Sequence, residues 1–170
     1  NYDQPYDFNG DNFTDISLSQ RVSLFQKWNF KRRSNKAFNM AFRLYSEDRW
    51  GGEMQWNKDY RGGNEVYGES IYTDRFEFMS LYQLPTKELL NLSISVNGHQ
   101  QDSYYGDVPF IAEQYISFAQ LIWNHQYGKN DVLGGIATRY TLNNPFAEKK
   151  VSDKLLTFHP RKLCTIFSLR

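Results

Sequence analysis

The side chains in this sequence that could do chemistry are few, and their spacing argues against catalysis. The three histidines, His99, His125 and His159, are far apart in the sequence, and no two have the short spacing of a metal-ligand motif. The sequence has no glycine-rich phosphate loop, no His-Glu-x-x-His helix and no Gly-x-Ser-x-Gly elbow. We therefore expect no enzymatic activity, no metal site and no cofactor.

Acidic side chains are the other candidates for proton-transfer chemistry. Glu47, Asp48 and Glu53 are close in the sequence, but Arg43 and Arg49 lie within reach of them. Opposite charges on one face of a sheet form ion pairs, so a structural role is the better interpretation. The pairs we expect are Arg43 with Glu47 and Arg75 with Glu77.

The segment 50–68 has the composition of a binding loop. Two Gly-Gly pairs break the surrounding pattern, and aromatic side chains stand among a few charged ones. Such a mixture suits a sugar, a chelate or a cofactor-like ligand. A loop that only packs on its neighbours has the same composition, and this alternative stays open. The candidate ligand-binding residues are Trp50, Trp56, Tyr60, Arg61 and Tyr67 of the loop, with Tyr104 and Tyr105 on the same rim.

The whole chain sets limits on the elements that position these residues. It has 170 residues, a net charge of +1, a single cysteine (Cys164) and no apolar run long enough for a membrane helix. The balanced charge gives no support to nucleic acid as a partner. Aromatic residues make up 17% of the chain, yet the mean hydropathy is −0.69. A chain rich in aromatic residues can still be hydrophilic on average if every second residue is polar, so the two values suggest strict alternation of apolar and polar residues.

That alternation is present, and it predicts long β-strands. Six strands are expected, joined by short turns at 31–36, 85–88 and 128–131 that alternate with longer connections at 50–68, 102–112 and after 142. The expected strands are 16–30, 38–47, 69–84, 90–99, 113–127 and 132–142.

The two faces of the predicted strands differ sharply in chemistry. The polar face is rich in Ser, Asn, Gln, Ala and Thr, as in a hydrated lumen, although the solvated side of a half-buried sheet is an alternative. Strands of about fifteen residues, tilted by about 45°, rise roughly 35 Å, which exceeds the apolar band of about 25 Å in an outer-membrane barrel. The apolar face is expected to hold Ile16, Leu18, Val22, Leu24, Phe38, Met40, Phe42, Leu44, Phe76, Phe78, Leu90, Leu92, Ile94 and Val96.

Aromatic residues flank each short turn, as they do where barrel strands leave the hydrocarbon. Ordinary pairing of aromatic side chains across strands is the alternative explanation. The residues concerned are Trp28, Phe30, Phe38, Tyr82, Trp123 and Tyr127.

Several segments, in order, resemble TonB-dependent outer-membrane receptors of the Bacteroidetes type. The similarity extends over about 13–142 and is carried by 43–52, 67–77, 97–106, 111–114 and 136–141. These segments read RLYSEDRWGG, YGESIYTDRFE, NGHQQDSYYG, IAEQ and IATRYT.

The resemblance implies an all-β fold, an antiparallel up-and-down meander of about six long strands that is a segment of a 22-stranded transmembrane β-barrel. It divides the chain into 1–12, a remnant of an extracellular loop; 13–142, the barrel segment; and 143–170, a loop or atypical C-terminal tail. The similarity fades beyond Asn144, and 161–170 is not expected to form the family's strand. Lumen-lining positions would be Arg43, Glu47, Arg75, Glu77, Asn97 and His99.

The implied function is uptake of a nutrient such as a siderophore, vitamin or oligosaccharide across the outer membrane of a Gram-negative cell. The partners would be the nutrient at the extracellular mouth, the membrane lipid, and TonB and a plug domain reached through parts of the barrel missing from this chain. We therefore expect a truncated or fragmentary chain. Two alternatives are a soluble β-sandwich or jelly-roll carbohydrate-binding module and, disfavoured by the missing motifs, an enzyme.

Overall fold

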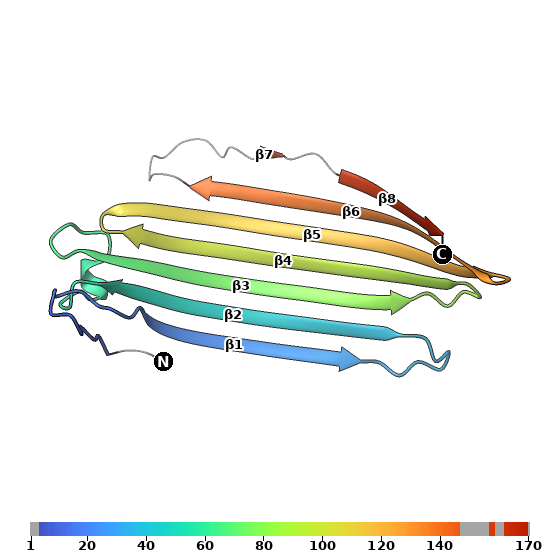
Figure 1. Ribbon diagram of the computed structural model, residues 1–170, viewed down its shortest axis with the longest axis horizontal. Coiled ribbons are helices and arrows are strands. Elements are labelled where there is room, and N and C mark those ends of the chain that lie inside the picture. Colours follow the sequence, from blue (N-terminus) through green and yellow to red (C-terminus); the bar gives the residue numbers. More distant parts are fainter. Residues whose placement is uncertain (1–3, 147–156, 159–161, 170) are drawn as a thin grey trace.

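The computed structural model describes residues 4–146, 157–158 and 162–169. Its strands form one antiparallel sheet in which six long strands follow one another in sequence order (Figure 1). This confirms the predicted all-β up-and-down meander, and the sheet is open. The long strands are β1 (Leu18–Asn29), β2 (Phe38–Gly52), β3 (Gly68–Gln83), β4 (Leu89–Tyr105), β5 (Val108–Tyr127) and β6 (Asn130–Phe146).

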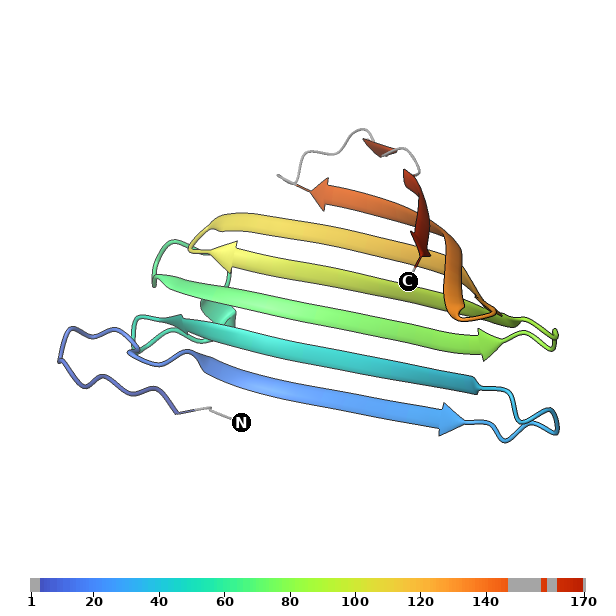
Figure 2. The same cartoon turned by 45° about the vertical axis from the view of Figure 1, so that its right-hand side comes forward.

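The sheet has two different ends. One end carries the connection 53–67, which holds the 3-10 turn η1 (Lys58–Tyr60), and the segment that precedes β1. The other end carries the connections 30–37, 84–88 and 128–129 (Figure 2). We call these the long-loop end and the short-turn end.

The described part of the chain is a single layer and has almost no core. The buried hydrophobic side chains are Leu18, Trp56 and Val66, whereas more than twenty large hydrophobic side chains are exposed. Globular domains bury their apolar faces between two or more layers. No second layer covers either face of this sheet within the described residues.

The register separates the residues into the two predicted faces. Residues directly opposite each other in an antiparallel pair point to the same side. One continuous row therefore crosses all six strands on the apolar face: Leu24, Leu44, Phe76, Gly98, Tyr115 and Leu142. The predicted apolar residues within the strands share this face, while Ile16 precedes β1. The opposite face holds Arg43, Glu47, Arg75, Glu77, Asn97 and His99.

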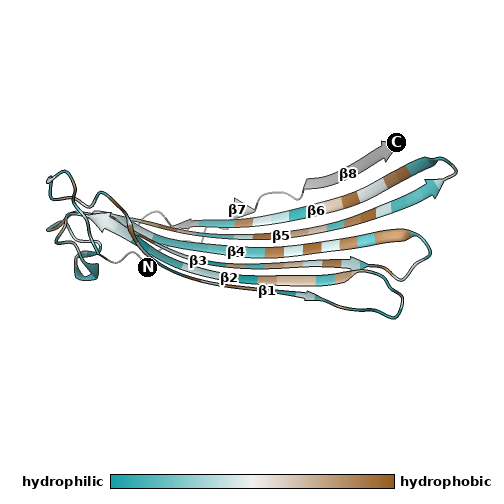
Figure 3. Ribbon diagram, turned by 60° about the horizontal axis from the view of Figure 1, so that its bottom comes forward, coloured by the Kyte–Doolittle hydropathy of each residue, from teal (hydrophilic) through white to brown (hydrophobic). Residues whose placement is uncertain are grey.

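The apolar face is apolar over only part of its length. Toward the short-turn end its rows are mostly hydrophobic, for example Phe42, Phe78 and Val96, with small or amide side chains among them (Gln26, Ser80 and Ser117). Toward the long-loop end the colours turn hydrophilic (Figure 3). The face changes from apolar to polar between one row of residues and the next. We call its apolar part the apolar band. The first polar row beyond the band on β2 to β6 is Ser46, Asp74, Gln100, Glu113 and Asn144.

The predicted long connection at 102–112 is wrong. β4 continues to Tyr105 and β5 begins at Val108, so only Gly106 and Asp107 join them. Gly106 has a φ of +62° and its N–H donates to the carbonyl oxygen of Gly68 at 2.9 Å. A Gly-Asp pair between strands favours a tight hairpin. The strict alternation of short and long connections therefore fails at this position.

The C-terminal part also differs from the prediction. β6 extends to Phe146, and β8 (Lys162–Leu169) pairs antiparallel with β6 from Val132 to Arg139. A two-residue strand, β7 (Thr157–Phe158), pairs with β6 as well. The ladder joins backbone groups, so a segment with weak alternation can still pair with a free strand edge. The segment 162–169 is thus a strand, although 161–170 alternates weakly and was not expected to form the family's strand.

A close approach of aromatic rings explains the glycine in the middle of β4. A Cβ atom at Gly98 would lie 2.3 Å from Phe76 Cε1 and 2.9 Å from Tyr115 Cε1. The rings of these two residues lie 6.4 Å apart and cover the glycine from both neighbouring strands. Aromatic side chains placed over a strand glycine restore the packing that the missing side chain cannot supply.

We expect Gly98→Ala to destabilise the sheet by about 1–3 kcal/mol, because the added methyl must displace the two rings. The midpoint of urea unfolding of the chain refolded into phospholipid vesicles, followed by tryptophan fluorescence, measures this effect. The same substitution should cost much less in a Phe76→Ala background, where the closest ring is gone. An equal cost in both backgrounds would contradict the packing described here.

Candidate functional site

Arg61 of the connection 53–67 is clamped onto the ends of β3 and β4. Its Nε donates to Ser70 Oγ at 2.8 Å, and its Nη2 donates to Asp102 Oδ1 at 2.9 Å and to the Asp102 carbonyl oxygen at 3.0 Å. The guanidinium also lies between two rings, 4.2 Å from the centroid of Tyr72 and 4.4 Å from that of Tyr104. A planar guanidinium suits both contacts, because it forms hydrogen bonds in its plane and stacks on its faces. We call this arrangement the Arg61 clamp.

The rest of the connection packs closely around the clamp. Trp56 is buried, and its indole occupies the space where a side chain at Gly68 would lie, 2.3 Å from an ideal Cβ. Gly62 adopts a φ of +77° directly against the Tyr104 ring. A side chain at either glycine would push the loop off the sheet. The sequence therefore has glycine where an aromatic ring packs directly against the backbone.

A second cation, Lys58, lies beside the clamp in a more exposed position. Its ammonium group forms an ion pair with Asp48 at 3.1 Å and lies 5.5 Å from the ring centroids of both Trp50 and Tyr72. All of these sheet residues belong to the face that carries the apolar band, at its polar end. The long-loop end thus presents aromatic rings already occupied by the chain's own cations.

The seven candidate ligand-binding residues do not form one site. Arg61 and Tyr104 form part of the clamp, Trp50 lies beside Lys58, Trp56 is buried beneath the loop, and Tyr60 is half-buried. These contacts are what the loop-packing alternative predicts for Trp56, Arg61 and Tyr104. The two remaining candidates are more exposed. The exposed fraction is 45% for Tyr67 and 40% for Tyr105.

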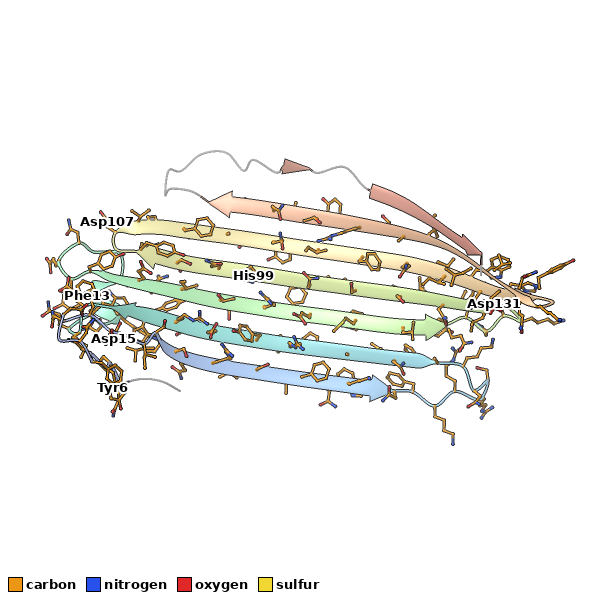
Figure 4. The ribbon with its side chains drawn as sticks, viewed as in Figure 1. Tyr6, Phe13, Asp15, His99, Asp107 and Asp131 are labelled. Atoms are coloured by element: carbon orange, nitrogen blue, oxygen red, sulfur yellow. The ribbon has the colours of Figure 1, made fainter. Side chains whose placement is uncertain are left out.

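A pocket of about 430 Å³ lies near Tyr67, between the segment that precedes β1 and the ends of β2 and β3. Phe13 and Asp15 contribute to it from that segment and lie together at the long-loop end (Figure 4). Arg49 and Glu69 supply charges from the sheet. Sequence reasoning missed Phe13 and Asp15, because their place depends on long-range contacts of this segment with the loop, the bridge between Phe13 and Glu53 and the hydrogen bond from the N–H of Met54 to the carbonyl oxygen of Asn12.

Hydrogen bonds order the walls of this pocket. The Tyr67 ring lies 6.4 Å from that of Phe13, and its hydroxyl donates to Glu69 at 2.8 Å, which raises the pKa of the phenol. Asp15 accepts the backbone N–H of Phe8 at 2.6 Å. Two rings with nearby carboxylates and a guanidinium can hold a polar, ring-shaped ligand. This pocket is the best-formed candidate for ligand capture on the polar face.

The polar face carries ion pairs that run across strands. Arg43 pairs with Glu77 at 3.2 Å, and Glu47 pairs with Arg21 and with Arg49. The predicted pair Arg43–Glu47 is therefore wrong, because these residues are four positions apart on one strand, about 13 Å along it, whereas Glu77 lies directly opposite Arg43 on β3.

The prediction for Arg75 is corrected in the same way. Its guanidinium lies 3.4 Å from His99 Nδ1 on the next strand. In Figure 4, His99 lies near the middle of β4, away from the labelled residues at both ends of the sheet. This places His99 beside Arg75 on the polar face.

Other kinds of site and comparisons with known proteins add little. Among the residues that the structure describes, no three His, Cys, Asp or Glu side chains come together as metal ligands. No helix in that same part of the chain is long and apolar enough to cross a membrane. Comparisons of the chain with protein-family models, curated proteins and solved structures gave no match.

We expect Arg61→Met to release the connection 53–67 from the sheet, because it leaves Asp102 and Ser70 without their donor. Hydrogen bonds to charged groups contribute about 1.5–3 kcal/mol each, so chymotrypsin cleavage at Trp56 and Tyr60 should accelerate at least tenfold. Lys58→Met is the matched control, since its exposed ion pair contributes about 0–1 kcal/mol. Equal cleavage of the two variants would show that the clamp does not hold the loop.

Proposed function

We propose that this chain is a segment of the wall of a transmembrane β-barrel, from a TonB-dependent receptor that takes up a nutrient across an outer membrane. The apolar face of the sheet is the observation that carries the proposal. It is uncovered within the described residues, and it changes to polar along one row near the long-loop end. A face in contact with hydrocarbon needs this pattern, whereas a face in water does not tolerate so much exposed apolar surface.

The length of the apolar band supports a membrane as its partner. On β4 the band extends from Leu90 to Gly98, which is about 27 Å along a strand. With a tilt of about 40° this corresponds to a height of roughly 20 Å, close to the apolar band of about 25 Å in outer-membrane barrels. The polar rows beyond Gly98 then stand in water outside the bilayer.

Aromatic side chains mark the limit of the band at the short-turn end. Phe30 and Phe38 stack with their centroids 4.6 Å apart, and Tyr82 meets Phe38 edge-on at 5.4 Å. Trp28 and Trp123 stand on the same face of the sheet. Such rings suit the headgroup layer of a bilayer. Cross-strand packing and a membrane girdle are compatible, because the same rings can serve both.

The opposite face would line the lumen of the barrel. Its cross-strand pair Arg43–Glu77 and the contact between Arg75 and His99 keep charged groups paired with one another. Polar side chains in a narrow, hydrated interior are held in this way. The pocket near Tyr67 lies on this side and would open into the extracellular mouth, where it would contribute to capture of the nutrient.

The edge of β1 gives a further reason to regard the chain as part of a larger wall. This strand pairs with β2 on one side, and its other side carries no strand among the described residues. In hydrocarbon each unpaired backbone group costs several kcal/mol, so membrane-spanning sheets close on themselves. Further strands, the plug and the site of contact with TonB would lie in parts of the protein beyond this chain.

Spin labels at Ile94 and Ser95 test the membrane assignment, since these neighbours on β4 point to opposite faces. In the chain refolded into phospholipid vesicles, with Cys164 changed to Ser, a nitroxide at Ile94 should be accessible to oxygen dissolved in the lipid. A nitroxide at Ser95 should be accessible to a water-soluble nickel complex. Labels at Gln100 and Gln101, in the polar rows, should both be accessible to the nickel complex. Equal accessibility of Ile94 and Ser95 would rule out a wall with one face in lipid.

The oligomeric state in water gives a second test. The purified chain should form inclusion bodies or aggregates, because the free strand edge can pair with another copy and the exposed apolar band favours association. Light scattering and thermal unfolding in plain buffer measure this. A monomer with a sharp thermal transition would refute the barrel wall and favour the soluble carbohydrate-binding module instead.

A further inference from the structure

The two ends of the sheet carry opposite charge. The three connections at the short-turn end hold six basic residues and one acid, Glu88, while Asp131 stands just inside β6. At the long-loop end, the segments 4–17, 53–67 and 106–107 hold seven acids and two basic residues, Lys58 and Arg61. The net charge of the chain conceals this separation. The six basic residues are Lys31, Arg32, Arg33, Lys36, Lys87 and Lys129.

Two of these basic residues tie neighbouring turns together. Arg32 donates to the carbonyl oxygen of Gln83 and lies 4.4 Å from the ring centroid of Tyr82. Lys36 donates to the carbonyl oxygen of Thr86 in the next turn. The connection 30–37 is thereby fixed against 84–88, which brings the remaining basic side chains of the two turns onto one surface.

The other four basic residues form no such hydrogen bond between turns of the described residues. Lys31, Arg33, Lys87 and Lys129 are exposed, and none forms an ion pair with a carboxylate of the described residues. The one acid in these turns, Glu88, is hydrogen-bonded to His125. We call these four side chains the basic rim. The rim borders the aromatic rings of Phe30, Phe38 and Tyr82 that end the apolar band.

We propose that the basic rim binds the headgroups of anionic phospholipids in the membrane leaflet at the short-turn end. The inference rests on the proposed function, because the aromatic rings place the rim at headgroup height only if the apolar band lies in a bilayer. Unpaired ammonium and guanidinium groups at that height complement lipid phosphates. The acidic long-loop end would repel the same lipids, so the charge separation also favours one direction of insertion.

Flotation of the refolded chain with two kinds of vesicle tests this proposal. One kind contains phosphatidylcholine alone, and the other contains 30% phosphatidylglycerol by composition. Each basic residue near an anionic surface strengthens binding about fivefold, so Lys31→Gln/Arg33→Gln/Lys87→Gln should lose about 100-fold of the preference for the anionic vesicles. The preference of the unaltered chain should also vanish in about 1 M salt, where screening is nearly complete.

A charge-matched control separates the rim from the net charge. Gln4→Glu/Gln55→Glu/Asn64→Asp changes the net charge by the same amount at exposed positions of the long-loop end. This control should keep the preference for anionic vesicles. An equal loss in both triple variants would overturn the rim as the binding surface, as would an unchanged preference in the variant that lacks three basic residues.

The same experiment distinguishes failure of the rim from failure of the barrel wall. Insertion into both kinds of vesicle with equal affinity would overturn lipid binding by the rim and leave the proposed function standing. No association with either kind of vesicle would overturn both, since a wall segment without affinity for a bilayer has no membrane role. Protection of the Ile94 label from the water-soluble nickel complex reports insertion independently of charge.

Discussion

A single β-sheet has no interior, and this constraint governs every other feature of the chain. Each side chain of a strand must face one of two environments, and the backbone ladder alone holds the strands in register. With three buried hydrophobic side chains in the described residues, packing contributes little inside the sheet itself. Its faces must therefore be stabilised by whatever lies against them. The faces differ in chemistry, although the polar face also carries Phe25 and Met79, and the proposed function assigns the two faces different surroundings.

The same constraint explains what the sequence predicts well. Where one face is apolar and the other polar, the period of two is strong, and six strands in order follow from it. Where both faces are polar, alternate residues no longer differ in hydropathy, and the period of two cannot be recognised in the sequence. The stretch from His99 to Tyr105 has polar or mixed residues on both sides, so the extension of β4 and the turn at Gly106 were not apparent. The misplaced turn thus lies at the long-loop end, where both faces of the strands are polar.

Pairings between distant residues could not be predicted, because they depend on register. Arg61 and Asp102 are separated by 41 positions, and only the alignment of β3 with β4 brings Ser70, Tyr104 and Asp102 beneath the loop. Composition singled out Arg61 and Tyr104 but not Tyr72, and it could not distinguish binding from packing. Phe13 and Asp15 gave no signal at all, since their pocket depends on a segment that folds back onto β2.

The Arg61 clamp and the apolar band belong to the same face, and their order along the strands has a physical consequence. Arg61, Asp102, Lys58 and Asp48 bring charges onto this face only about two rows beyond Gly98. Charged groups in hydrocarbon are costly even when paired, so a bilayer against the band must end before the clamp. In the proposed membrane setting, the clamp and the carboxylates of Asp74 and Glu113 would limit how deeply the sheet sits, and the aromatic rings at the short turns would limit it from the other side. A face bounded by charges at one end and by rings at the other would then have one preferred position along the membrane normal.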